Sequence, residues 1–224
     1  ICGLDPQHNR STVDADCADI ARMHLEHGTN RSAMDYRGWN SLHFGAARGF
    51  TRYCDVLCSW NGSNVENTRR VQDVDVTASI LDPVPDFNID QGDSEGRSAL
   101  MLAVLNGHND TMHVLLKHGA DIAHQSNSGQ TILHLATARV SSNYSASMLG
   151  KFTAVADLCA KHDLIDKDDT HNRTALMYAV LGKRLDVVKI LLYHHADPTR
   201  LDSFNTSVSS MASKSPDIYA TISE

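Results

Sequence analysis

The sequence predicts an all-α repeat solenoid within a single domain of 224 residues. A block of polar, small and apolar residues returns after 33 positions, from Gly96 to Gly129 and again from Asn172 to Asn205. Inside each block the apolar residues follow helical spacing, as in 100–104. Because one helical unit of this size cannot bury its own apolar face, stacked neighbours must complete the core.

The repeated block occurs four times in clear form. Its copies are residues 37–46, 95–104, 128–136 and 171–180. A second marker recurs together with the first and lies ten residues before the turn of the next copy. This marker is Gly28, Gly119 and His195. Two independent markers with one period indicate a true internal repeat.

These blocks, together with the triplets Gly119-Ala120-Asp121 and His195-Ala196-Asp197, resemble the ankyrin repeat over nearly the whole chain. The resemblance implies a unit of turn, short helix, second helix and β-hairpin loop, repeated about five to six times with two insertions. We expect the repeat frames to be 1–34, 35–92, 93–125, 126–168, 169–201 and 202–224, the last acting as a cap.

The two terminal frames depart most from the pattern. In the first, only a second helix is readable, and segment 5–10 is too polar for a first helix, so we expect a loop there. The residues expected to point inward from that second helix are Cys17, Ile20, Ala21 and Leu25. In the last frame, Ser209 stands where a buried leucine is expected, and a short helix should run from near Pro216 to about Ile222.

The middle frames carry signals for helix ends. Ser98 and Thr174 occupy N-cap positions, where a hydroxyl accepts an unpaired helix N–H. Gly119 stands where a left-handed residue commonly ends a helix. His195 takes the same place without a glycine, which predicts a slightly strained cap.

Two insertions interrupt the period. The longer one falls near 63–85, and the shorter one, rich in Ser, Asn and Tyr, near 141–150. Insertions in a solenoid become loops and often lie on a functional face. A tolerated surface loop is the alternative at both places, since loop length costs little free energy.

Composition restricts the class of partner. The chain is 42% hydrophobic and 21% charged, as an ordinary globular protein is, and its formal charge of −7 disfavours direct nucleic-acid binding. Apolar runs are too short to cross a membrane, and the five scattered cysteines indicate a reducing compartment, so we expect a cytoplasmic and/or nuclear monomer. Because the sequence begins at Ile1 rather than Met, we expect it to belong to a longer protein.

The hairpin tips and first helices of ankyrin repeats line a concave face, so we expect a protein partner there, with a basic segment as one option. Exposed aromatic and arginine side chains are common interface anchors. The candidate partner-binding residues are Tyr36, Arg37, Trp39, Asn40, Phe44, Glu95, Arg97, Leu102, Asn127, Gln130, Leu135, His171, Arg173, Tyr178 and Phe204.

Two of these assignments have structural alternatives. Trp39 could instead pack on a neighbouring hairpin. The residues after the helix-start His or Met form a row that reads either as an exposed apolar docking stripe or as semi-buried packing. This row is Phe44, Leu102, Leu135, Tyr178 and Met211.

The sequence offers no catalytic, cofactor or metal motif, so we expect neither an enzyme nor a bound cofactor in this region. His43 and His134 match a structural histidine position of the repeat. Cys54 and Cys58 lack a second ligand pair at zinc spacing. Four acids of one hairpin, within 163–169, are either a solvated turn or an attraction for a basic partner.

Two classes of function remain open. Three features resemble IκB-type inhibitors of Rel-homology transcription factors. They are the segment from Leu25 to His43, the following repeat with its extended second half, and the degenerate last repeat. The alternative is a scaffold, adaptor or targeting domain of a larger protein, such as a ubiquitin-ligase adaptor, a channel, a kinase or a pathogen effector.

Overall fold

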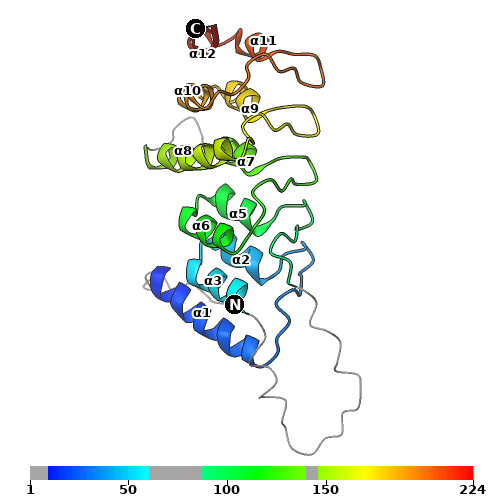
Figure 1. Cartoon of the computed structure of the whole chain (residues 1–224), viewed down its shortest axis with the longest axis vertical. Coiled ribbons are helices and arrows are strands. Elements are labelled where there is room, and N and C mark those ends of the chain that lie inside the picture. The colour runs from blue at the N-terminus through cyan, green and yellow to red at the C-terminus, as the bar shows by residue number, and fades with distance from the viewer. Residues whose placement is uncertain (1–9, 61–86, 140–145, 224) are drawn as a thin grey trace, which may run out of the picture.

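The computed structural model describes residues 10–60, 87–139 and 146–223, and these ranges form an all-helical solenoid (Figure 1). Helix pairs stack along one axis from the blue N-terminal end to the red C-terminal end, and loops project from one side of the stack. The predicted fold class is therefore confirmed. The exact frames of the repeats stay a prediction.

The helices form two layers. The inner layer, next to the projecting loops, is α2 Ser41–Arg48, α5 Ala99–Asn106, α7 Ile132–Arg139, α9 Ala175–Leu181 and α11 Val208–Ala212. The outer layer is α1 Arg10–Glu26, α3 Thr51–Ser59, α6 Asn109–Lys117, α8 Ala146–Lys161, α10 Leu185–Tyr193 and α12 Pro216–Ser223. Consecutive inner helices pack against one another, and one large hydrophobic core runs along the stack. A second, smaller cluster of Val13, Cys17 and Phe50 lies at the N-terminal end.

The inner helices start as the sequence predicts. The Ser98 hydroxyl accepts the backbone N–H of Met101, and the Thr174 hydroxyl accepts that of Met177, so both N-caps are confirmed. Asn40 caps α2 in the same way, and the His43 ring completes a reciprocal capping box. Helices α2, α5 and α9 therefore begin at a fixed residue, which sets the register of their apolar side chains.

The outer helix α3 is capped from the preceding repeat. Asp14, a buried residue of α1, accepts the backbone N–H groups of Arg52 and Tyr53 at 3.0 Å each. These donors lie in the first turn of α3, whose own N-cap residue Phe50 offers no side-chain hydrogen bond. A carboxylate at a helix N-terminus also meets the positive end of the helix dipole. Asp14 thus joins the first repeat to the second.

The C-terminal ends of the inner helices are capped by cationic or imidazole side chains of the following repeat. His108 hydrogen-bonds to the carbonyl oxygen of Ala47 at 3.2 Å, and Arg139 donates to that of Leu105 at 2.7 Å. Arg184 donates to the carbonyl oxygen of Thr137. Positive groups suit these helix ends because the dipole is negative there.

The structure tests the sequence predictions made for the degenerate parts of the repeat pattern. Ile20 was expected to point inward but is 46% exposed, because α1 turns Cys17, Ala21 and Leu25 toward the core instead. His195 does adopt a left-handed conformation, with φ of +62°. The last helix, Pro216–Ser223, also agrees with the prediction.

The shorter insertion was only partly a loop. Helix α8 begins at Ala146 and has 16 residues, so half of the expected loop 141–150 forms the first turns of the second helix. Ala, Met and Leu in 146–150 favour helix, and that signal was outweighed by the Ser and Asn before it. Residues 140–145, the insertion 63–85 and residues 5–9 of the expected loop 5–10 lie outside the described part. Arg10, the last residue of that expected loop, instead begins helix α1.

Replacing Asp14 by alanine should lower the free energy of unfolding by about 1 kcal/mol, because two N–H groups of α3 lose their acceptor. Urea denaturation followed by circular dichroism measures this. Asp16→Ala, an exposed carboxylate on the same helix, is the matched control and should change stability far less. Equal effects of the two variants would contradict the capping role.

Candidate functional site

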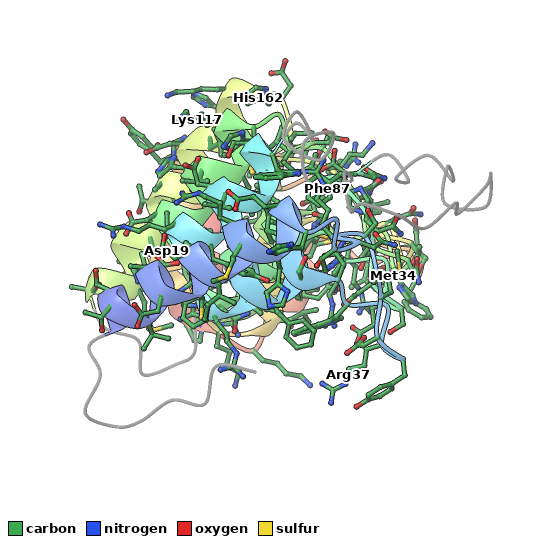
Figure 2. All side chains as sticks on the ribbon, turned by 90° about the horizontal axis from the view of Figure 1, so that it is seen from below. Asp19, Met34, Arg37, Phe87, Lys117 and His162 are labelled. Carbon is green, nitrogen blue, oxygen red and sulfur yellow. The ribbon has the colours of Figure 1, made fainter. Side chains whose placement is uncertain are left out.

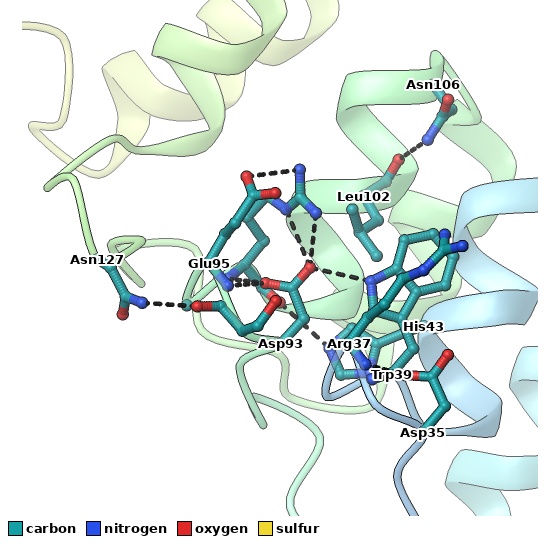
Figure 3. A network of polar contacts seen from close by, with 12 residues as sticks. Asp35, Arg37, Trp39, His43, Asp93, Glu95, Leu102, Asn106 and Asn127 are labelled. Atoms are coloured by element: carbon teal, nitrogen blue, oxygen red, sulfur yellow. Dashed lines mark hydrogen bonds and ion pairs between the residues drawn. The ribbon is translucent and has the colours of Figure 1, made fainter.

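The hairpin loops form a row along one side of the solenoid, and one carboxylate organises the best-defined turn. Asp93 Oδ1 accepts the backbone N–H groups of Glu95 and Arg97 at 2.9 Å each. Asp93 Oδ2 accepts the Arg97 guanidinium at 2.8 and 3.0 Å and the Trp39 indole N–H at 3.0 Å (Figure 3). One side chain therefore closes its own turn and binds the preceding repeat.

Three other hairpins close their turn with an aspartate in the same way. In the first, Asp35 Oδ1 accepts the backbone N–H groups of Arg37 and Trp39 at 2.8 and 2.9 Å. Asp169 Oδ1 accepts the backbone N–H groups of His171 and Arg173, and Oδ2 accepts the hydroxyl of Tyr178 at 2.7 Å. Asp202 accepts the N–H groups of Phe204 and Thr206.

The hydrogen bonds lower the pKa of the buried turn aspartates, as Asp93 and Asp169 show. Burial alone would raise the pKa of Asp93, but the donors from Arg97 and the Glu95 N–H outweigh it. For Asp169 burial is again the largest single influence and raises the pKa, yet the donors Arg173, Tyr178 and His171 bring it below its usual value. Both groups are therefore carboxylates at neutral pH, as the turns require.

The turns need a left-handed residue at their fourth position. Gly96 adopts φ of +73° there, and an added Cβ would meet Asn127 of the next hairpin at 2.3 Å. In the fifth-repeat turn Asn172 takes the same conformation with φ of +55°, which asparagine tolerates better than most residues.

Backbone hydrogen bonds join the hairpins to one another. Each joins a tip N–H of one hairpin to a tip carbonyl oxygen of the preceding one. The pairs are Ser94 N–H to Arg37, Asn127 to Glu95, Thr170 to Ser128 and Ser203 to His171, at 2.8 to 3.1 Å. The tips are therefore fixed relative to each other, which pre-organises any surface they present.

The two structural histidines are buried and hydrogen-bonded at both ring nitrogens. His134 Nδ1 accepts the Thr131 N–H at 3.2 Å, and Nε2 donates to the Arg173 carbonyl oxygen at 2.9 Å. His43 bonds likewise to Asn40 and to the Arg97 carbonyl oxygen. Burial lowers the pKa of both rings. Their predicted structural role is confirmed.

The candidate residues fall into three groups by exposure. The exposed ones are Tyr36, Arg37, Phe44, Glu95, Asn127, His171 and Phe204. The half-buried ones are Trp39, Arg97, Gln130, Arg173 and Tyr178. The buried ones are Asn40, Leu102 and Leu135. Only the first group offers a large share of its surface to a partner, such as 42% for Phe44 and 86% for Tyr36.

Structural contacts explain why several candidate residues are buried or half-buried. Asn40 is the buried N-cap of α2, and Trp39 donates to Asp93, which is the packing alternative weighed for it. Leu102 and Leu135 are 2% and 7% exposed because neighbouring inner helices cover them, so the apolar row is semi-buried packing at these two positions. It is not a continuous exposed stripe.

Exposed aromatic surface gathers at the two ends of the hairpin row. At the N-terminal end Tyr36 is 86% exposed, and its hydroxyl accepts a hydrogen bond from Arg37 Nε at 2.8 Å. At the C-terminal end Phe204 is 72% exposed, with the Arg173 guanidinium 5.9 Å from its ring centre. Figure 2 shows Arg37 and Met34 on the hairpin side, away from Lys117 and His162 of the outer side.

Sequence reasoning missed two exposed apolar residues next to these ends. Met34 is 48% exposed one residue before the first hairpin, and Leu201 is 45% exposed beside the last. Each is an apolar residue immediately before a turn aspartate, which is the one signal that could have drawn attention to them.

No metal or membrane element emerges from the part of the chain that the structure describes. Within 10–60, 87–139 and 146–223, no three His, Cys, Asp or Glu side chains are placed to hold a metal ion. In these same ranges no helix is both long and apolar enough to span a bilayer. Burial raises the pKa of Cys58 and Cys159 to about 12, so these thiols are not activated nucleophiles.

Comparison with known proteins agrees with this architecture. A family model for ankyrin repeats in three copies matches residues 72–149 and 143–202. The chain is 23% identical to human (Homo sapiens) inversin over 202 residues, which is 85% of the chain and 19% of inversin. It is 28% identical to the potassium channel AKT2/3 of Arabidopsis thaliana over 153 residues, which is 57% of the chain and 19% of the channel. The chain thus spans about a fifth of each relative's length.

The buried His134 should make the fold weaker in mild acid. An unfolded histidine takes up a proton near its usual pKa of 6.5, whereas the folded ring resists protonation, so stability falls as pH drops below about 6.5. In His134→Gln, the loss of unfolding free energy between about pH 8 and about pH 5.5 should be smaller than in the unaltered chain. Urea titrations at each pH measure it.

His162→Gln, at an exposed outer-layer position, is the control for that comparison and should keep the full pH dependence. If His134→Gln and His162→Gln show the same slope of stability against pH, burial of the His134 ring is not the source of the acid sensitivity.

Proposed function

Because the chain belongs to the ankyrin-repeat family, we propose that it is a non-catalytic protein-binding module serving as an adaptor, scaffold or targeting domain of a larger protein. Its relatives support this class, since one is a potassium channel and in both the matched region is 19% of a longer chain. Cytoplasmic and/or nuclear localisation and a monomeric state belong to the same proposal.

The observation that carries the proposal is the pair of exposed aromatic ends on a rigid hairpin row. Tyr36 and Phe204 stand at opposite ends of tips that are hydrogen-bonded in series. Tyr36 and Arg37 are of the residue types that contribute strongly to protein interfaces. A fixed row loses little conformational entropy on binding, which favours recognition of a folded partner surface.

Aromatic contacts rather than acidic attraction should dominate this interface. The acidic hairpin uses most of its carboxylates internally: Asp166 accepts the Asp197 N–H at 2.9 Å, Asp168 pairs with Arg200 at 3.1 Å, and Asp169 closes its turn. Glu95 is paired with Arg97 at 2.9 Å. The two arginine pairs offset the charge of Asp168 and Glu95, and the backbone contacts occupy oxygens of Asp166 and Asp169, so fewer carboxylate oxygens are open to a basic partner segment.

The IκB-type reading is the more specific alternative and has less support. It rests on the resemblance of the segment from Leu25 to His43 to an IκB-type repeat and on the degenerate last repeat. Inversin and a plant channel, as matched relatives, favour the adaptor class instead. The full chain to which this region belongs would separate the two classes.

Replacing the two terminal aromatics should weaken partner binding at least about tenfold each, which corresponds to the loss of one interface anchor. The test is proximity labelling in cells with the full protein, followed by quantitative mass spectrometry for Tyr36→Ser, Phe204→Ser and the unaltered chain. Partners of the hairpin face are those whose recovery falls in both variants.

Tyr193→Ser is the matched control, since Tyr193 is 79% exposed but lies at the end of the outer helix α10. It should leave recovery of those partners unchanged. Recovery that is equal in all variants, or lost equally with Tyr193→Ser, would exclude the hairpin row as the binding face.

A further inference from the structure

The hairpin row ends in an unpaired backbone donor. In the four later hairpins, the second residue of the turn donates its backbone N–H to the carbonyl oxygen of the third residue of the preceding turn. These donors are Ser94, Asn127, Thr170 and Ser203. Tyr36 holds the same position in the first hairpin, and among the described residues its N–H has no acceptor. By the same geometry, this N–H faces out of the N-terminal end of the row.

The backbone around this donor is held from both sides. Asp35 Oδ1 accepts the backbone N–H groups of Arg37 and Trp39, which closes the turn. The Arg37 carbonyl oxygen accepts the Ser94 N–H at 2.8 Å, which fixes the first tip to the second. A donor on a backbone fixed in this way loses little conformational entropy when a partner binds it.

The same tip carries a cation that no carboxylate neutralises. Arg37 is exposed, its Nε donates to the uncharged Tyr36 hydroxyl at 2.8 Å, and its guanidinium lies 5.1 Å from the Tyr36 ring centre. Among the described residues Arg37 forms no ion pair, because Asp35 binds backbone N–H groups instead. The two terminal nitrogens of its guanidinium remain for the paired hydrogen bonds that a carboxylate accepts.

This free cation distinguishes the N-terminal end from the rest of the row. Glu95, the third residue of the second turn, pairs with Arg97 at 2.9 Å. At the C-terminal end Arg173 lies 3.6 Å from Asp202, which offsets its charge. In the described hairpins no other arginine or lysine is the second or third residue of a turn. Figure 2, which views the molecule from the N-terminal end, shows Arg37 projecting away from the helices.

We propose that the N-terminal end of the hairpin row binds an acidic loop of a partner protein. An Asp or Glu of that loop pairs with Arg37, a backbone carbonyl oxygen accepts the Tyr36 N–H, and an apolar side chain packs on the Tyr36 ring. The partner thus supplies the oxygen that a preceding hairpin supplies to each later tip. This inference rests on the proposed role of the hairpin row as the binding face and adds the chemistry that its N-terminal end selects.

A second copy of this chain fits the same end less well. Its last hairpin has a matching carbonyl oxygen, that of Phe204, which has no donor among the described residues. The carboxylate of that hairpin, Asp202, already accepts the N–H groups of Phe204 and Thr206 and lies near Arg173. A head-to-tail pair of chains would therefore leave Arg37 without a carboxylate from that hairpin.

The test starts from a displayed library of cyclic peptides selected on the 224-residue chain, each with a random loop of about eight residues, a length typical of compact surface loops. Enriched peptides should carry Asp or Glu beside an aromatic or aliphatic residue. Fluorescence anisotropy then gives the Kd of the best peptide. Enrichment of basic peptides, or of peptides without a carboxylate, overturns the proposal.

Variants place the bound peptide. Arg37→Gln should raise its Kd at least about tenfold and flatten the salt dependence of binding, and Arg37→Lys should restore only part, because lysine lacks the guanidinium fork. Arg52→Gln, at an exposed arginine of α3, is the matched control and should change Kd less than about twofold. Circular dichroism should show unchanged folding, since both arginines are exposed. Equal effects of Arg37→Gln and Arg52→Gln overturn the proposal.

Amide hydrogen exchange, resolved by residue with NMR, tests the backbone contact. The Tyr36 N–H should exchange rapidly in the free chain and at least about tenfold more slowly with saturating peptide. The Ser94 N–H, which is bonded to Arg37 in the structure, should be protected in both states. Tight peptide binding that leaves the exchange of the Tyr36 N–H unchanged contradicts the proposed contact.

Three outcomes would separate this proposal from its neighbours. If Tyr36→Ser weakens peptide binding and Arg37→Gln does not, the hairpin face stands and its selection of carboxylates is overturned. Sedimentation that shows a dimer lost in Tyr36→Ser would assign this end to a second copy of the chain. Peptide binding that appears only after deletion of residues 1–9 would assign it to the chain's own N-terminal segment.

Discussion

The stacking of this solenoid depends on carboxylates that each perform two tasks. Asp93 closes its hairpin through two backbone N–H groups and, with its other oxygen, holds the indole of Trp39 from the preceding repeat. Because the same group fixes the turn and the neighbour, the shape of one repeat determines where the next one stands. Asp14 does the comparable task in the outer layer, where it caps α3 from α1. Short helices of eight or nine residues are marginal alone, so these shared acceptors, together with apolar burial, make the repeats cooperative.

This constraint decides which surface is left for binding. Several residues that a hairpin presents are used inside the stack. Trp39 donates to Asp93 of the next hairpin and Gln130 donates to the Tyr178 hydroxyl of the next repeat, while Arg97 bonds within its own turn. A repeat in the middle of the stack has a neighbour on both sides, whereas a terminal repeat has one. Unpartnered aromatic and apolar surface consequently collects at the ends, at Tyr36 and at Phe204. Recognition by this chain is for that reason expected at the ends of the row more than at its centre.

The sequence predicted what the repeat period controls and failed where the period is broken. Ser98 and Thr174 were identified as caps because a hydroxyl before an apolar helical run has one strong use. Asn40 occupies the same position, but as an amide beside Tyr36 and Trp39 it was taken for a contact residue. Leu102 was placed in the right row with its burial left open, since the closeness of neighbouring helices is a tertiary property. Ile20 was assigned to the wrong face of its helix, and the start of α8 was taken for a loop. Ile20 lies in a degenerate frame and α8 begins in an insertion, so neither has a second copy in the sequence that would show which residues face inward.

A module with surface at both ends can hold two partners without passing signals between them. The N-terminal end of the hairpin row presents Tyr36 with Arg37, while the C-terminal hairpin presents Phe204 with Arg173 nearby. Contacts in a solenoid run only between neighbouring repeats, so binding at one end mainly stabilises the repeats next to it. Coupling to the other end would require an element with two arrangements in between, and the described hairpins are instead joined tip to tip by backbone hydrogen bonds. A stack joined in this way keeps its two ends at a fixed distance, which is the property that the proposed adaptor role requires.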